Sequence, residues 1–265
     1  MKLNYSLQPG ELQSGSPAVI LIHGMFGSLS NLGVLARALT EDHQVISVDL
    51  RNHGDSPHES LMDLPSMAAD IVELMNDLKL TSATLIGHSL GGKVAMQVAL
   101  NNPERVSDLV VIDIAPVTYA ARQDAALDAL NLLAENAIHS RRDADGLISA
   151  HIAEASVRAF LLKNLARNPA GDFSLKLNLQ SVNQNYATTL VSGPTGDPYK
   201  GPTLFLKGEH SAYIQQKHRP IIQQLFPNSQ LEVVVDTGHW LHAEKPETVN
   251  ALIRAFIETK TPTKA

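Results

Sequence analysis

Two kinds of apolar pattern alternate along the chain. Short runs of aliphatic and β-branched residues predict buried strands, and stretches with apolar residues every three or four positions predict amphipathic helices. Strands are expected at residues 18–22, 44–48, 83–86, 109–112, 203–206 and 231–235, with a further edge strand at residues 4–7. This alternation is typical of an α/β protein with a mostly parallel sheet that helices cover on both faces.

The alternation stops between Pro116 and Lys200, where the apolar spacing is almost entirely helical. Residues 173–179 are an exception, because they alternate with period two and predict a short extended arm. Residues 192–202 contain three prolines and three glycines, which is typical of a linker. We therefore predict a core formed by residues 1–115 and 200–265, and a helical cap formed by residues 116–199.

Composition narrows the possible classes of protein. The 265 residues are 44% hydrophobic and 18% charged, which excludes a disordered chain. Lys and Arg number 21 against 27 Asp and Glu, with no basic run, so a nucleic-acid partner is not expected. The absence of cysteine excludes disulfides, a thiolate nucleophile and cysteine metal sites. No apolar run is long enough to span a membrane, and we expect a cytoplasmic protein.

Residues 87–91 read Gly-His-Ser-Leu-Gly between a predicted strand and a predicted helix. In that context a G-x-S-x-G motif is a sharp turn that presents Ser89 as a nucleophile, although Ser89 could instead cap the helix. Residues 87–93 also fit the first part of a phosphate-binding loop. However, Val94 lacks the hydroxyl that would hold Mg²⁺, so Lys93 is expected on the exposed side of the helix.

A nucleophilic serine of this kind requires two N–H donors for an oxyanion. One is the amide of Leu90, which follows the nucleophile. The second is expected from the Gly-rich loop at residues 23–27, with Met25 as the first choice and Phe26 as the second. We interpret His23 in the same loop as a structural histidine.

A general base must reach Ser89 from the edge of the sheet where the strands end. His239 follows the strand at 231–235 through a short Gly turn, and we predict that it is this base. His242 lies three residues further on, but a metal pair with His239 would need a third ligand, and none is evident nearby. No metal and no cofactor are expected.

Several of these motifs occur in an order that resembles the α/β-hydrolase superfamily. They are the His-Gly loop at residue 23, Asp-Leu-Arg-Asn-His-Gly-Asp-Ser at 49–56, Gly-His-Ser-Leu-Gly-Gly at 87–92, and the late Gly-His at 238–239. Residues 23–28, 51–54, 111–116 and 238–246 further resemble the small bacterial esterases of the YbfF type. The resemblance implies an α/β-hydrolase fold with an eight-stranded sheet, a Ser-His-acid mechanism, and hydrolysis of ester or thioester bonds.

The acid of the triad is the departure from the common superfamily pattern. It is usually an Asp in the loop after the strand at 203–206, but residues 207–213 contain none. Asp113, at the end of the strand at 109–112, is the expected substitute, unless it is only a turn residue. In the YbfF-type pattern, Ser211 also lies near the histidine. Glu209 and Asp236 remain weaker alternatives.

We therefore expect a carboxylesterase or thioesterase, acting on small-molecule esters or acyl-CoA through an acyl-enzyme. Phe26 and the cap residues Phe160 and Phe173 are predicted to contact the substrate. A carbon–carbon bond hydrolase or a cofactor-free perhydrolase could use the same triad. A non-catalytic ligand-binding or signalling homologue is the alternative of another class.

Overall fold

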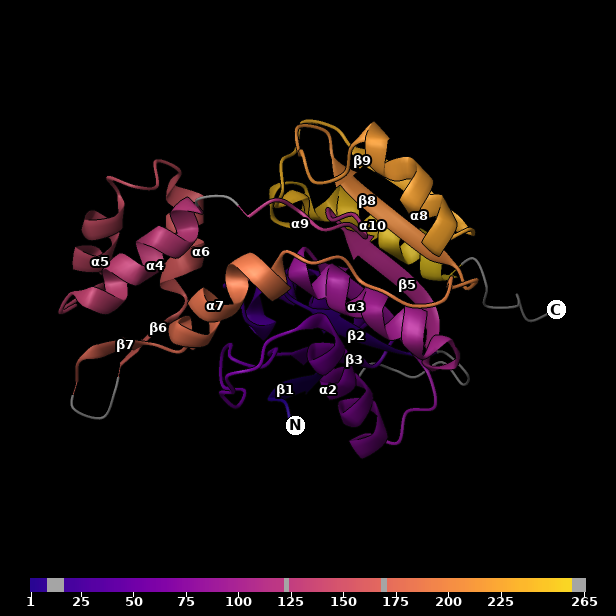
Figure 1. Ribbon diagram of the computed structural model, residues 1–265, viewed down its shortest axis with the longest axis horizontal. Helices are drawn as coiled ribbons and strands as arrows, with labels where there is room; N and C mark the ends of the chain where they lie inside the picture. Colours follow the sequence, from indigo (N-terminus) through magenta and orange to yellow (C-terminus); the bar gives the residue numbers. More distant parts are fainter. Residues whose placement is uncertain (9–16, 122–123, 168–170, 259–265) are drawn as a thin grey trace.

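The computed structural model describes residues 1–8, 17–121, 124–167 and 171–258 of the chain. Its main sheet has the strand order β1-β3-β2-β4-β5-β8-β9 (Figure 1). The strands are β1 (Tyr5–Gln8), β2 (Ala18–Ile22), β3 (Val45–Val48), β4 (Ala83–His88), β5 (Val106–Ile112), β8 (Thr203–Gly208) and β9 (Ser229–Val234). Only β1 runs antiparallel to its neighbour in this sheet. The predicted strands and their mostly parallel arrangement are therefore confirmed.

The expected number of strands was eight, whereas the described residues form seven in this sheet. The described chain ahead of β2 supplies a single strand, β1, which pairs with β3 from Tyr5 opposite Val48 to Gln8 opposite Val45. Residues 1–4 before it have no regular secondary structure. The described residues therefore form one strand fewer than the resemblance implied.

Helices cover both faces of the sheet because successive strand residues point to opposite sides. In β2, Ile20 and Ile22 join the apolar cluster under α2 (Leu64–Asp77) and α3 (Leu90–Asn101). Val19 and Leu21 join the cluster under α1 (Gly33–Leu39) and α10 (Pro246–Glu258). The continuous apolar run of β2 is thus explained by burial on both faces.

Shorter elements complete the core. They are the 3₁₀ turns Leu29–Leu32, Pro103–Arg105 and Gln216–His218, and the helices α8 (Arg219–Leu225) and α9 (Leu241–Glu244). None of the helices in the described ranges combines the length and the apolar character needed to cross a bilayer.

The segment between β5 and β8 is mainly helical, as predicted. It contains α4 (Ala125–Glu135), α5 (Arg141–Ile148), α6 (Ala155–Leu162), the hairpin of β6 (Leu165–Arg167) and β7 (Phe173–Leu175), α7 (Leu179–Asn185) and a π-helical turn, Tyr186–Leu190. Side-chain caps fix three of the helix starts. Asp124 accepts from the amide of Ala126 at 2.9 Å, Ser140 from that of Asp143 at 3.1 Å, and Asn178 from that of Ser181 at 3.3 Å.

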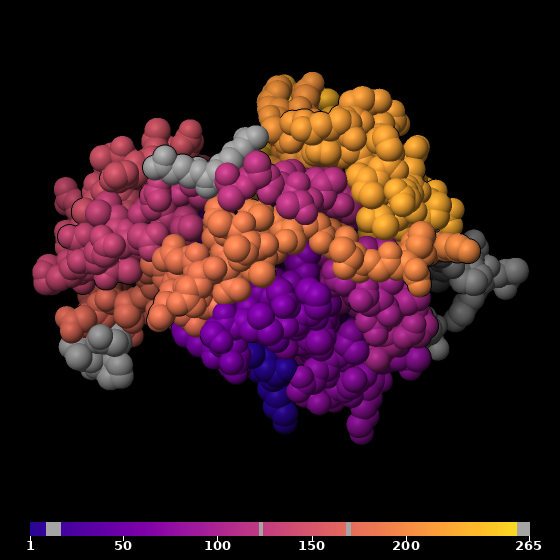
Figure 2. Space-filling model, in the orientation of Figure 1, coloured from indigo at the N-terminus to yellow at the C-terminus, as the bar shows by residue number. Residues whose placement is uncertain are grey.

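Helices α4, α5 and α6 lie to one side of the sheet (Figure 1). The chain that follows α7 returns to β8 across the face on which α3 lies, and it is seen on the surface as the orange band in Figure 2. This return segment therefore connects the helices beside the sheet to the centre of the molecule.

Candidate active site

Ser89 lies where β4 turns into α3, in a backbone conformation that non-glycine residues rarely adopt. Its φ is 52° and its ψ is −117°. Its amide donates to the carbonyl of Ile112 on β5 at 2.9 Å, and its carbonyl accepts from the amide of Lys93 at 3.1 Å. Strain of this kind persists only where neighbouring structure fixes the backbone, and it is concentrated at functional sites.

Two glycines make this turn possible. A Cβ on Gly87 would lie 2.2 Å from the carbonyl oxygen of Gly91, and a Cβ on Gly91 would lie 2.2 Å from that of Ile22. No side chain fits at such distances, so β4, α3 and β2 can approach this closely only with glycine at both positions.

Asp113 follows β5, the strand beside β4, and its carboxylate is completely buried. Its Oδ2 accepts hydrogen bonds from Nδ1 of His239, at 2.7 Å, and from the hydroxyl of Ser211. Its Oδ1 accepts from the amide of Gly208 at 3.1 Å. The three donors compensate the desolvated charge and fix the carboxylate in one orientation.

The contact with Asp113 also determines the state of the His239 ring. Because Nδ1 carries the donated hydrogen, Nε2 of the neutral ring is the nitrogen that can take up a proton. Glu209 instead accepts from the amide of Asp236 at 2.8 Å, and Asp236 lies 3.4 Å from the ammonium of Lys245. The structure thus brings Asp113 and Ser211 to His239, and it directs the two rival carboxylates elsewhere.

The loop after β2 is a tight turn in which the amide of Gly27 donates to the carbonyl of Gly24 at 3.0 Å. The Phe26 amide donates to Nε2 of His53 at 3.2 Å. Because this amide already has an acceptor, Phe26 is disfavoured as an oxyanion donor, and the amide of Met25 remains the candidate from this loop. The other candidate is the amide of Leu90, which lies at the start of α3 and has no acceptor within the helix.

Three buried histidines, His23, His53 and His88, contact this loop or His239. His23 contacts the carbonyl of Gly24 through Nδ1 at 2.7 Å and accepts from the amide of Leu50 at 3.0 Å, so it is structural, as predicted. His88 contacts the carbonyl of His239 through Nε2 at 3.0 Å. Burial lowers the pKa of His23 to about 4, that of His53 to about 3, and that of His88 well below its usual value. These rings are neutral at pH 7.

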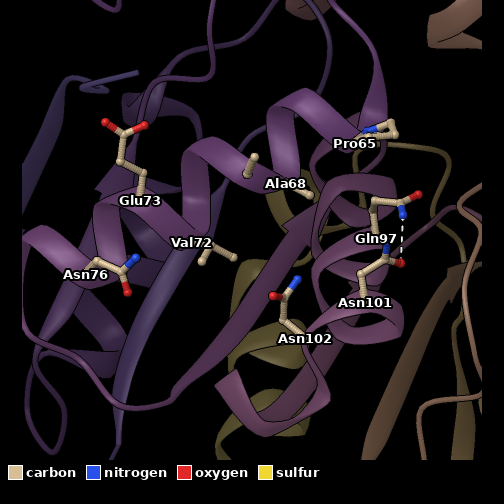
Figure 3. A pocket seen from close by; sticks show the side chains of 9 residues that line it. Pro65, Ala68, Val72, Glu73, Asn76, Gln97, Asn101 and Asn102 are labelled. Atoms are coloured by element: carbon tan, nitrogen blue, oxygen red, sulfur yellow. Dashed lines mark hydrogen bonds between the residues drawn. The ribbon is translucent and has the colours of Figure 1, made fainter.

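A cavity of about 560 Å³ connects these parts. Ser89, Met25, Leu90, His239, Phe26 and Phe160 all line it, and its walls come from both the core and the segment between β5 and β8. A smaller hollow of about 280 Å³ lies between α2 and α3, lined by residues such as Glu73, Gln97 and Asn101 (Figure 3). None of the predicted catalytic residues lines that hollow, so the larger cavity is the candidate active site.

Phe173, which is also predicted to contact the substrate, is not among the residues that line the larger cavity. It belongs to β7, where the guanidinium of Arg167 lies 5.0 Å from its ring centroid. The period-two pattern that includes Phe173 reflects a hairpin whose half-buried side chains pack against the apolar core. Hydrophobicity alone does not distinguish a side chain that packs against the core from one that contacts the substrate.

Lys93 also differs from expectation, because it is 2% exposed rather than a surface residue. Its ammonium donates to the carbonyls of Leu190, Val191 and Ser192 at 3.4, 2.8 and 2.6 Å. Burial lowers its pKa to about 7, while carbonyl acceptors favour its charged form. Lys93 therefore ties α3 to the end of the π-helical turn and the residues that follow it.

Two tyrosines at the site were missed in the sequence. The ring of Tyr213 lies 4.2 Å from that of His239, centroid to centroid. The hydroxyl of Tyr119 donates to the carbonyl of Tyr213 at 2.6 Å and accepts from the amide of Ala115 at 2.9 Å. Tyr213 could have been noticed because it lies two residues after Ser211, but nothing in the sequence singles out Tyr119.

Comparison with known proteins agrees with this geometry. The family model described as alpha/beta hydrolase fold matches residues 17–246. The chain belongs to the α/β-hydrolase family. Esterase YbfF from Escherichia coli K12, a relative, is 38% identical over 258 residues, which cover 97% of this chain and 99% of that protein.

This α/β hydrolase is also similar to an animal protein and to a protein of known structure. The sn-1-specific diacylglycerol lipase ABHD11 of Mus musculus is 38% identical over 266 residues, covering 97% of this chain and 85% of that protein. A marine microorganism esterase superposes with a TM-score of 0.89 at 35% identity, covering 97% of this chain and 99% of that one. These relatives are named as esterases and a lipase, and all are similar to this chain over nearly its whole length.

Proposed function

We propose that the protein is a serine hydrolase that cleaves carboxylic ester or thioester bonds through an acyl-enzyme. The observation that carries the proposal is the hydrogen bond from His239 to the buried carboxylate of Asp113, at the cavity that Ser89 also lines. The names of the relatives, which are esterases and a lipase, support the same class of reaction.

In the first half-reaction, Ser89 attacks the acyl carbonyl while Nε2 of His239 takes the serine proton. Asp113 stabilises the imidazolium that forms, and Ser211 helps to hold the carboxylate in place. The amides of Leu90 and Met25 donate to the oxyanion of the tetrahedral intermediate. His239 then gives its proton to the leaving alkoxide or thiolate.

In the second half-reaction, water attacks the acyl-enzyme and His239 again acts as the base. The intermediate collapses, the carboxylic acid leaves, and Ser89 regains its proton. Each of these steps uses side chains and backbone amides of this chain, so the proposal includes no cofactor.

We propose that residues 116–199 act as a cap that selects the substrate over a core of residues 1–115 and 200–265. Phe160 and Val157 of α6, together with Tyr186, line the same cavity as Ser89. Apolar side chains in this position favour an acyl or alcohol chain over a charged group. The leaving group can be an alcohol or a thiol such as coenzyme A.

A panel of p-nitrophenyl esters and acyl-CoA thioesters of graded chain length tests the proposal. The purified protein should hydrolyse at least one series, and a fluorophosphonate should label Ser89. Ser89→Ala is the control, and it should lower kcat by roughly 10⁶ and abolish labelling. Labelling without ester hydrolysis would instead favour a carbon–carbon bond hydrolase or a perhydrolase, and no labelling would favour a non-catalytic homologue.

A further inference from the structure

Phe26 is held from two sides by residues far apart in the chain. Its φ is 62°, in the left-handed region that non-glycine residues rarely adopt. Its amide donates to His53 of the core at 3.2 Å, and its carbonyl accepts from Nδ2 of Asn164 at 2.8 Å. A strained turn beside a candidate oxyanion site is thus fixed partly from the segment between β5 and β8.

Asn164 is well placed to act as a fixed donor. It is 5% exposed and lies between α6 and β6. Its side-chain amide also donates to the carbonyl of Leu161 at 3.0 Å, and its backbone carbonyl accepts from the amide of Lys176 at 2.9 Å. The two hydrogens of this one amide group therefore join the cap to the loop after β2.

A chain of hydrogen bonds leads from Asn164 to the amide of Met25. Asn164 donates to the carbonyl of Phe26, which shares a peptide group with the amide of Gly27. That amide donates to the carbonyl of Gly24 at 3.0 Å, and this carbonyl shares a peptide group with the amide of Met25. Each bond in such a chain orients and polarises the next one.

We propose that Asn164 is a positioning residue that couples the cap to the oxyanion hole. The inference rests on the proposed function, in which the Met25 amide stabilises the oxyanion. With Asn164 in place, the Phe26 turn keeps the conformation that aims this amide into the cavity. Without it, the left-handed Phe26 loses one of its two anchors, and the transition state loses part of its stabilisation.

The test compares two matched substitutions, Asn164→Asp and Asn185→Asp. Asn185 also belongs to the cap and also donates through Nδ2 to a core backbone carbonyl, that of Ser60, at 2.8 Å. It makes a second bond within the cap, to the carbonyl of Ser181 at 2.8 Å. Both changes remove the donor and keep the side-chain shape, but only the first affects the turn at Phe26.

We expect Asn164→Asp to lower kcat on p-nitrophenyl acetate by about 10- to 100-fold with little change in KM, because removing a whole oxyanion donor costs about 10²–10³. The affinity for an aryl trifluoromethyl ketone, whose adduct with Ser89 carries the oxyanion, should fall by a similar factor. Asn185→Asp should leave both values near those of the unmodified protein. If Asn164→Asp folds poorly, Asn164→Ser, which adds no charge, takes its place. We expect Asn164→Ser to show the same losses of kcat and of ketone affinity.

Wild-type kcat and ketone affinity in folded Asn164 variants would overturn the coupling while leaving the proposed function intact. Equal losses in Asn185→Asp would overturn it too, because they would indicate a general loosening of the cap. If the unmodified protein hydrolysed no ester, the proposed function would fail, and this inference with it.

Discussion

His239 and Ser211 donate to the same oxygen atom, Oδ2 of Asp113. The other oxygen of that carboxylate is occupied by the amide of Gly208. The acid follows β5, yet its donors come from β8, from the loop after β8 and from the loop after β9. The loop after β8, in which the superfamily resemblance leads one to expect the acid, supplies the hydroxyl of Ser211, and this hydroxyl donates to a carboxylate that follows the neighbouring strand β5.

The first prediction concerns this acid. Asp113→Asn should lower kcat by about 10⁴, because an amide cannot hold the catalytic tautomer of His239. Ser211→Ala should cost much less, since the bond from His239 to Asp113 remains. Glu209→Gln is the control and should leave kcat nearly unchanged in steady-state assays. If Glu209→Gln were inactive and Asp113→Asn nearly normal, the assignment of the acid would be wrong.

The second prediction separates two phenylalanines. Phe160→Ala should change the preference among p-nitrophenyl esters of different chain length more than it changes the rate on acetate, because Phe160 lines the cavity. Phe173→Ala removes a similar ring from β7, away from the cavity, and should leave that preference unchanged. Ratios of kcat/KM across the ester series provide the measurement. A similar change of preference in both variants would contradict the placement of Phe173.

The third prediction concerns stability at acidic pH. The pKa of His23 is lowered to about 4 and that of His53 to about 3, whereas in the unfolded chain both are about 6.5. As the pH falls below about 6.5, the unfolded chain takes up protons that the native state does not. The free energy of unfolding should therefore decrease towards pH 4, by up to about 1.4 kcal/mol per pH unit for each residue.

Urea unfolding at several pH values between 7.5 and 4.5 measures this slope. In His53→Gln the side chain does not titrate, and its carbonyl oxygen can still accept from the amide of Phe26. We expect a shallower decrease in that variant than in the unmodified protein. Identical slopes would show that His53 is protonated to the same extent in both states.

The fourth prediction concerns Lys93. Lys93→Met keeps an unbranched chain but removes the ammonium that donates to the carbonyls of residues 190–192. Although the carbonyl of Val191 keeps the amide of Tyr119 as a donor, the loss should cost about 1–3 kcal/mol of stability. Lys176→Met, which breaks an exposed ion pair with Asp55, is the control and should cost about 0–1 kcal/mol. Thermal unfolding of both variants measures the two losses of stability. An equally small effect in Lys93→Met would mean that the return segment does not depend on this lysine.

The strands and the nucleophile turn could be predicted from the sequence because their causes are local. An apolar run predicts a strand buried on both faces, and Gly87 and Gly91 around Ser89 predict a close crossing of strand and helix. The order of motifs also located His239. These features depend on residues adjacent in the chain, or on the rule that parallel strands end at one edge.

Other features depended on contacts between distant segments. The burial of Lys93 depends on carbonyls almost 100 positions later, and the choice between Met25 and Phe26 depends on where His53 lies. Phe160 and Phe173 have the same chemistry and occur in similar apolar patterns, so only their packing separates them. No pattern in the sequence contains such information.

The chain order of the three proposed catalytic residues has a consequence for biosynthesis. Ser89 and Asp113 directly follow the neighbouring strands β4 and β5, whereas His239 follows β9, the last strand of the sheet in chain order. A nascent or truncated chain that ends before residue 239 contains the nucleophile and the acid but no base. Under the proposed mechanism, hydrolytic activity therefore begins only after β9 and residue 239 have been made, and a growing chain that lacks them cannot cleave esters.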